Sequence, residues 1–282
     1  MATPTLNQTK SKTSRPQLRL TIAKVRILEM LSEYFVLRTK DIAELNRNRI
    51  PNDSDIRTAR HTLILLTKAG LVNRIPYLDL DLEGGGRTYA YGLSDRGVAM
   101  VESLWPLCKT FDEHSQRTLD HELEISFFHI ALKTFAVKNG LKLYWQQSDL
   151  KHTVSPDAMF ALTDPTKPED KNTHYYFLEI ERAKIGHYIK GEPSIIRKLA
   201  KYHEYYGTDL CEKEWLDFRQ FRVIVVQRTE ERMKNLLKEL NGTMNHRMFW
   251  LTTEDSYKVN IGAEVFRTPK DWATTSYSFL SL

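Results

Sequence analysis

One stretch, residues 156–182, limits the possible fold and function of this chain more than any other. It holds two runs rich in β-forming residues on either side of a polar segment, which predicts a hairpin or two paired strands. Side chains of a strand alternate between its faces, so Glu179 and Glu181 share one side. Asp157 begins the partner run and can meet that same side. Three carboxylates on one face repel one another, so they need a cation, a basic partner or a bound proton.

The composition is that of a globular protein, and its charge is unevenly distributed. With 282 residues, 41% of them hydrophobic, two domains are expected. Residues 1–110 carry 17 Lys and Arg against 11 Asp and Glu, whereas the remainder carries 24 against 25. The basic part is the natural partner of a polyanion. The two cysteines lack metal-ligand spacing, and no apolar run is long enough for a membrane span, so we expect a cytoplasmic protein.

The N-terminal part predicts a tail followed by helices and a β ribbon. Residues 1–18 are polar and predict a disordered basic tail, or alternatively a basic arm along DNA phosphates. Asp53 or Ser54 can cap the third helix, and Gly70 ends it. The expected elements are helices over 20–34, 39–45 and 55–69 and strands over 71–75 and 87–93.

The order of these pieces resembles a winged helix-turn-helix. The phrases TKDIAEL, HTLILLTKAGLV and YAYGLSDRG carry the resemblance, and we assign this domain to residues 19–112. The resemblance implies that the third helix enters the major groove of duplex DNA and that the wing contacts the backbone. The alternative is a winged helix used only for protein contacts or dimerisation. The candidate DNA-binding residues are Arg57, Arg60 and His61 in the groove and Arg74 and Arg87 on phosphates.

The C-terminal part predicts a mixed sheet covered by helices, as in an α/β or α+β domain. We assign it to residues 113–255, and we expect the Ser/Thr/Tyr-rich tail, 256–282, to pack loosely. The run 221–226 is apolar throughout, as is typical of a strand buried on both faces. The expected helices are 118–139, 194–206 and 229–240, and the further strands are 141–146 and 247–253.

This order is similar to the PD-(D/E)XK nuclease fold, with Pro156-Asp157 and Glu179-Ile180-Glu181 as its motif. The resemblance implies that Asp157 and Glu179 hold Mg²⁺ or Mn²⁺, which polarises a phosphate and activates water. Glu181 stands where the family has lysine. Lys198 or Lys201, on the next helix, can replace it, and Tyr202 follows as in a QxxxY motif. Alternatively, the two glutamates face solvent in surface ion pairs with Arg182, Lys184 or Lys198, or the site is vestigial.

A further ligand is expected from the helix that begins the C-terminal part. Its first turns carry His121 and Glu124, and either side chain can point into the carboxylate site. We therefore include Glu124 among the candidate metal ligands. The other reading is that acids in the first turns simply favour the helix dipole.

Together the two halves resemble the replication-relaxation family, over most of residues 20–255. The phrases HELE, PDA and LEIER carry the resemblance. It implies a DNA-binding protein of a mobile genetic element, tied to plasmid replication, transfer or relaxation and associated with the nucleoid or a plasmid. Its second domain is then nuclease-like, either inactive or still able to cleave. The alternatives are a Mg²⁺-dependent endonuclease or nickase, and a transcription regulator whose second domain dimerises or senses a ligand. The implied partners are double-stranded DNA, other replication or transfer proteins, and a second copy of the chain.

Overall fold

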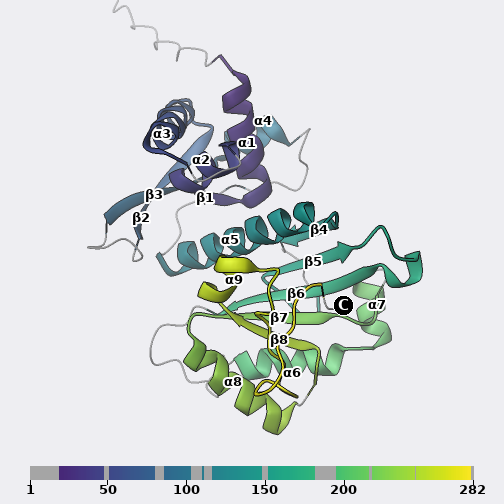
Figure 1. The fold of residues 1–282 in the computed structure, drawn as a ribbon. Coiled ribbons are helices and arrows are strands. Elements are labelled where there is room, and N and C mark those ends of the chain that lie inside the picture. Colours follow the sequence, from purple (N-terminus) through teal and green to yellow (C-terminus); the bar gives the residue numbers. More distant parts are fainter. Residues whose placement is uncertain are drawn as a thin grey trace, which may run out of the picture. The chain divides into compact units, whose positions relative to one another are not determined.

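The computed structural model describes most of the chain, which divides into two compact units. The units are Met1–Glu113 and His114–Leu282 (Figure 1). The described residues are 19–47, 51–79, 86–102, 110, 116–147, 152–181, 195–215, 218–244 and 246–280. The predicted tail, 1–18, lies outside them. None of the helices in these ranges has the length and apolar character that crossing a membrane requires.

The N-terminal unit combines helices with a small antiparallel sheet. Its three strands are ordered β1-β3-β2, so the ribbon of β2 and β3 is extended by a short strand that the sequence did not predict. The order of the three helices and the ribbon agrees with the prediction. The elements are α1 (Ile22–Tyr34), β1 (Val36–Arg38), α2 (Thr39–Arg47), α3 (Asp53–Lys68), β2 (Val72–Asp79), β3 (Gly86–Leu93) and α4 (Asp95–Val101).

Helix α3 is fixed by its cap and by its apolar side. Asn52 is the N-cap: its side chain accepts from the Asp55 amide, and the Asp55 carboxylate accepts from the Asn52 amide. The predicted cap at Asp53 or Ser54 is therefore wrong by one or two residues. Asp55 also pairs with Arg47 of α2 at 2.9 Å. Leu63 and Leu66 are fully buried on the inner side of the helix.

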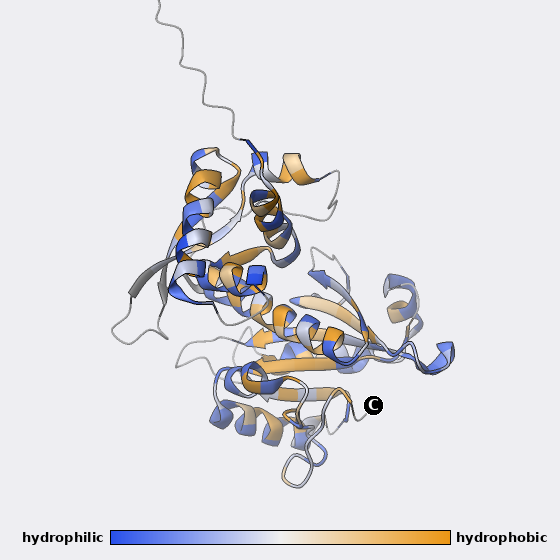
Figure 2. Ribbon diagram, turned by 45° about the horizontal axis from the view of Figure 1, so that its top comes forward, coloured by the Kyte–Doolittle hydropathy of each residue, from blue (hydrophilic) through white to orange (hydrophobic). Residues whose placement is uncertain are grey.

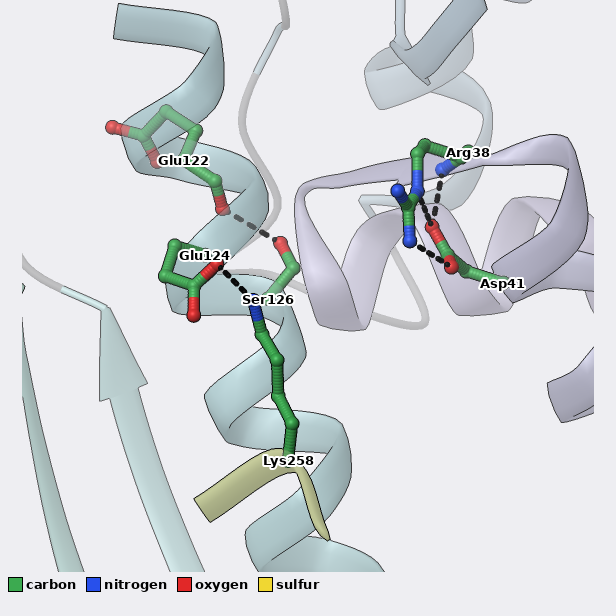
Figure 3. A network of polar contacts seen from close by, with 6 residues as sticks. All are labelled: Arg38, Asp41, Glu122, Glu124, Ser126 and Lys258. Carbon is green, nitrogen blue, oxygen red and sulfur yellow. Dashed lines mark hydrogen bonds and ion pairs between the residues drawn. The ribbon is translucent and has the colours of Figure 1, made fainter. Parts of the chain in front are cut away.

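A second local contact fixes the start of α2. The Asp41 carboxylate accepts from the backbone amide of Arg38 at 2.8 Å and from its guanidinium at 3.1 Å and 3.2 Å (Figure 3). Because Asp41 lies in the first turn, it satisfies an amide that the helix leaves without a partner. The strand β1 and the helix α2 are thereby joined without a loop.

The C-terminal unit is built on a five-stranded mixed sheet in the order β4-β5-β6-β7-β8. The pairs β4–β5 and β5–β6 are antiparallel, whereas β6–β7 and β7–β8 are parallel. This confirms the predicted mixed sheet with helices. The elements are α5 (Gln116–Lys138), β4 (Lys142–Gln147), β5 (Ala158–Thr163), η1 (Glu169–Lys171), β6 (Thr173–Glu181), α6 (Ile195–Tyr205), α7 (Asp209–Trp215), β7 (Arg222–Gln227), α8 (Glu230–Thr243), β8 (Phe249–Thr253) and α9 (Glu254–Asn260).

Helices cover both faces of this sheet, as Figures 1 and 2 show. Residues of α5 and α9, including Phe128 and Tyr257, pack on one face. Residues of α6, α7 and α8, including Tyr202 and Leu237, pack on the other face. The central strands are therefore buried on both sides, and Figure 2 shows their hydrophobic character. Their interior contacts are the main source of stability expected for this unit.

The predicted loose tail, 256–282, is instead part of the fold. Residues 254–260 form α9, and the following segment pairs with the sheet through the bridge between Leu251 and Arg267. Phe266 and Phe279 are buried among the aromatic rings of the sheet. The prediction is wrong because it read the polar residues as solvated and missed the two aromatic side chains that anchor the segment.

Candidate functional site

The two glutamates of β6 face the same side of the sheet, as strand alternation requires. Tyr176, Leu178 and Ile180 belong to the core under α5, so the intervening residues face α6. Glu179 is only 2% exposed, whereas Glu181 is partly exposed at the strand end. The reading of Glu179 as a solvent-facing acid is therefore excluded. A buried carboxylate requires hydrogen-bonding or charged partners.

Helix α6 supplies both partners of Glu179. The Lys198 ammonium donates to one carboxylate oxygen, and the Tyr202 hydroxyl donates to the other at 2.5 Å. Lys198 and Tyr202 are four residues apart, so they lie on one face of the helix. The Lys-x-x-x-Tyr spacing thus matches both oxygens of one acid.

Asp157 lies at the same site and is held from three directions. Its Oδ2 accepts from the Ile180 amide at 2.7 Å, and its Oδ1 lies 3.2 Å from His121 Nε2. The same Oδ1 is 4.0 Å from Lys198 Nζ. The ammonium of Lys198 is therefore within ion-pair distance of both acids, so the structure brings Asp157, Glu179 and Lys198 together.

The two acids have opposite pKa shifts. Burial, together with the charge of Asp157, raises the pKa of Glu179 to about 8 despite its contacts with Lys198 and Tyr202. Burial also acts to raise the pKa of Asp157, but the His121 hydrogen bond and the Lys198 charge outweigh it, and the pKa is lowered. Asp157 is thus the more readily ionised acid of the pair.

The two basic groups of the site have raised pKa values. Burial lowers the pKa of Lys198, but the charges of Glu179 and Asp157 more than compensate. Likewise, burial opposes protonation of His121, but its hydrogen bond to Asp157 raises the pKa overall. Both groups are therefore stabilised in their charged forms by the acids that they contact.

The remaining residues predicted for this site lie at its margin or elsewhere. Lys201 is exposed on α6 and has no ion pair within the described part of the chain. Glu181 contributes to the field at Lys198 and helps to raise its pKa. The basic residues Arg182 and Lys184, considered as surface partners, lie outside the described residues.

Glu124 contacts residues of α9 and, contrary to the prediction, does not point into the carboxylate site. It is fully buried on α5, where the Tyr257 hydroxyl donates to one oxygen. Lys258 donates to the other oxygen at 2.9 Å (Figure 3). Lys258 also lies 3.5 Å from Glu254. Glu124 therefore joins α5 to α9, and both its oxygens are used. In the part of the chain that the structure describes, no three His, Cys, Asp or Glu side chains form a group that could hold a metal.

The segment before Asp157 is held by a residue that the sequence did not single out. The Glu214 carboxylate, on α7, accepts from the Thr153 amide at 3.0 Å and from its hydroxyl at 2.8 Å. Tyr205 of α6 donates to the same carboxylate at 2.6 Å. Glu214 thus connects the segment before Asp157 with α7 and with α6, the helix that carries Lys198. Its role depends on tertiary contacts, so no local sequence signal could have shown it.

In the N-terminal unit, the predicted DNA-binding residues of α3 lie on its outer side. Arg57, Arg60 and His61 are all exposed, and none of them has an ion pair with another described residue. Arg74 is exposed on β2, with its guanidinium 4.3 Å from the centre of the Tyr89 ring on β3. Arg87 belongs to β3, and its side chain lies outside the described residues.

The comparisons with known proteins identify the family. Two solved structures of the restriction endonuclease FokI, one of them bound to DNA, have a TM-score of 0.32 and are 11% and 16% identical. They cover 84% of this chain in both cases, and the matches span 69% and 43% of the FokI chains. Similarity this low carries no argument about function. No curated protein matches the chain. The Replication-relaxation family matches residues 28–215, more than half of the chain, and the protein therefore belongs to the replication-relaxation family.

Proposed function

We propose that this protein binds duplex DNA through its N-terminal unit and acts in the replication, transfer or relaxation of a mobile genetic element. The observation that carries the proposal is the outer side of α3, where Arg57, Arg60 and His61 are exposed and have no ion pairs with described residues. Exposed guanidinium groups that form no ion pair with a described residue can neutralise phosphates. Family membership supports the role in replication or relaxation.

The arrangement of the unit supports a winged-helix mode of binding. In that mode α3 enters the major groove, and the ribbon of β2 and β3 lies along the backbone. Arg74 is held against Tyr89 on this ribbon, so its guanidinium is oriented before DNA arrives. Arg87 lies further along the same ribbon and would add a phosphate contact.

The test is a salt titration of duplex binding. For the full chain with Arg57→Ala and Arg60→Ala, we expect weaker binding and a smaller salt slope, because two positive charges that displace counterions from the DNA are lost. Arg26→Ala, an exposed cation of α1 in the same unit, serves as the matched control. An unchanged slope in the double variant would sink the assignment of α3.

A second candidate function is favoured by the shared position of Lys198 between two acids. Its ammonium lies within ion-pair distance of Asp157 and Glu179, so both carboxylates already face one cationic group. Mg²⁺ is commonly held by one or two carboxylates, with waters and substrate phosphates completing its shell. Asp157 and Glu179 therefore fit a divalent cation that replaces the ammonium, although Glu124 does not contribute.

In this second reading the protein is a metal-dependent endonuclease or nickase. Mg²⁺ or Mn²⁺ would polarise the phosphate and lower the pKa of an attacking water. The Ile180 amide and His121 hold the Asp157 carboxylate in place. Lys198, released from the acids, would neutralise charge on the phosphate, with Lys201 as the exposed alternative. Glu181 adds negative charge where lysine is usual, which favours a vestigial site.

Supercoiled plasmid separates the two candidates. Incubation with Mg²⁺ or Mn²⁺ should yield nicked circles if the site is active, and Asp157→Ala should abolish them. Glu212→Ala removes an exposed acid of α7 and serves as the control. Retarded but uncut plasmid with every metal would support the DNA-binding function without cleavage.

A further inference from the structure

Strand β4 forms one edge of the second sheet, and the helices on one side of the sheet do not cover it. It stands first in the strand order β4-β5-β6-β7-β8 (Figure 1). The core under α6, α7 and α8 includes Met159 of β5 but, among the described residues, none of β4. The sheet therefore extends by one strand beyond these helices, and this face of β4 is open.

Three polar side chains share the open face of β4. Trp145 stacks on His129 of α5, so it faces the α5 side of the sheet. Strand alternation then places Lys142, Tyr144 and Gln146 on the other side. The same side of the sheet carries the acid site that faces α6.

These side chains have the chemistry of a binding surface for a single nucleic-acid strand. The Tyr144 ring is 54% exposed, and its hydroxyl donates to the Gln146 side-chain oxygen at 3.0 Å, which helps to fix the ring. Lys142 is exposed and has no ion pair with a described residue, and β4 contains no acid. An exposed ring can stack on an unpaired base of any kind, while a neighbouring cation attracts the phosphate backbone. Paired bases are already stacked within the duplex, so such a ring favours an unpaired strand.

The register of β4 and β5 relates this face to the acid site. Tyr144 pairs with Ala161, four residues after Asp157. At about 3.3 Å per residue, the ring lies roughly 13 Å along the sheet from this acid. A strand bound on Tyr144 can therefore extend to the acid site without leaving this side of the sheet.

We propose that the open face of β4 binds single-stranded DNA, with an unpaired base stacked on Tyr144 and with Lys142 beside its phosphates. The inference rests on the proposed role in DNA replication, transfer or relaxation, and it adds a site for a strand that has been unwound or nicked. This site belongs to the second unit and is distinct from the duplex-binding surface of α3.

The test removes the ring but keeps a large side chain. For the full chain and a fluorescein-labelled oligothymidylate, Tyr144→Leu should bind about tenfold more weakly, because the stacked ring is lost. Tyr144→Phe keeps the ring and should bind as the parent does. Lys142→Ala should weaken binding and reduce its dependence on salt, whereas Tyr144→Leu should leave the salt slope unchanged.

The matched control is Val137→Ala, which shortens an exposed apolar side chain of α5, the helix on the opposite face of the sheet. It should leave binding of the oligonucleotide unchanged. Equal affinities of Tyr144→Leu and Tyr144→Phe would overturn the inference, because the ring would then contribute nothing. A change in the sedimentation coefficient of Tyr144→Leu without DNA would also overturn it, because the open face would then belong to an interface with a second copy of the chain.

Duplex binding, measured in parallel, separates this inference from the proposed function. If the parent binds duplex and Arg57→Ala with Arg60→Ala weakens that binding, but Tyr144→Leu and Tyr144→Phe bind the oligonucleotide equally, only the further inference fails. If the parent binds no duplex, the proposed function fails, whatever the oligonucleotide shows.

Discussion

The two units hold their functional charges in opposite ways. On α3 of the N-terminal unit, the cations are exposed and have no ion pairs with described residues. In the C-terminal unit, the acid Glu179 is buried and both of its oxygens have partners. A polyanion can bind the first surface without displacing a protein group, whereas a cation reaches the second site only by displacing Lys198. We therefore expect the first charges to act only in binding, as proposed, and the second to act in folding as well.

The largest effect that tests this contrast is expected for Lys198→Met. Above about pH 8, where Glu179 is ionised, removal of the ammonium leaves its buried carboxylate without a charged partner, which costs about 3 kcal/mol in the free energy of unfolding. Lys201→Met, on the same helix but exposed, should change it by less than about 0.5 kcal/mol. Urea unfolding of both variants gives the comparison. Equal and small losses would show that the buried pair does not contribute to stability.

The next effect is a pH dependence of stability that Glu179 creates. Its pKa is raised in the folded protein to about 8 from 4.5, so the folded state holds a proton that the unfolded state has lost between these values. The contribution of Glu179 to stability therefore falls as pH rises from about 4.5 to about 8. His121, whose pKa is also raised, acts in the same direction as pH rises above about 6.5.

The variant Glu179→Gln separates the contribution of Glu179 to the pH dependence from that of His121. The variant should lose less stability between pH 5 and pH 8 than the parent, as measured by thermal unfolding at a series of pH values. His121 remains in both proteins, so the difference between the two curves reports Glu179. Parallel curves would show that the acid is ionised throughout this range.

A smaller effect is expected at the cap of α3 in the N-terminal unit. Asn52→Ala removes the acceptor for the Asp55 amide and should cost about 1 kcal/mol. Ser54→Ala changes an exposed side chain within the same turn and should cost less than about 0.5 kcal/mol. Chemical unfolding of the two variants tests the position of the cap. A larger loss for Ser54→Ala would restore the cap predicted from the sequence.

The smallest effect on stability is expected for Arg57→Ala. The side chain is exposed and has no ion pair with a described residue, so the free energy of unfolding should change by less than about 0.5 kcal/mol. Duplex affinity should nevertheless fall. Unfolding and binding measured on one preparation test this separation, and a loss of stability comparable to that of Asn52→Ala would contradict it.

Much of this molecule follows from periodicity. Alternation along β6 correctly placed Glu179 and Glu181 on one face and Ile180 on the other. The four-residue spacing of Lys198 and Tyr202 is a local signal, and α6 does direct both side chains to Glu179. These predictions hold because each depends only on the geometry of one element.

The errors came from features that no single element determines. Helix α5 is buried on most of its sides, so its apolar pattern could not show that Glu124 faces Tyr257 rather than Asp157. A helix cap can be supplied by Asn52, Asp53 or Ser54, and only the folded structure distinguishes them. The packing of 256–282 depends on a pairing with β8, which lies earlier in the chain.

The place of β6 in the sheet has a consequence for how the acid site can be lost. It is the middle strand, paired with β5 on one edge and β7 on the other, and its two faces are covered by helices. Fraying begins at margins, so amide hydrogens of β6 should exchange with solvent only in molecules that have opened completely. Glu179 should therefore keep its place in the sheet until the whole second unit unfolds.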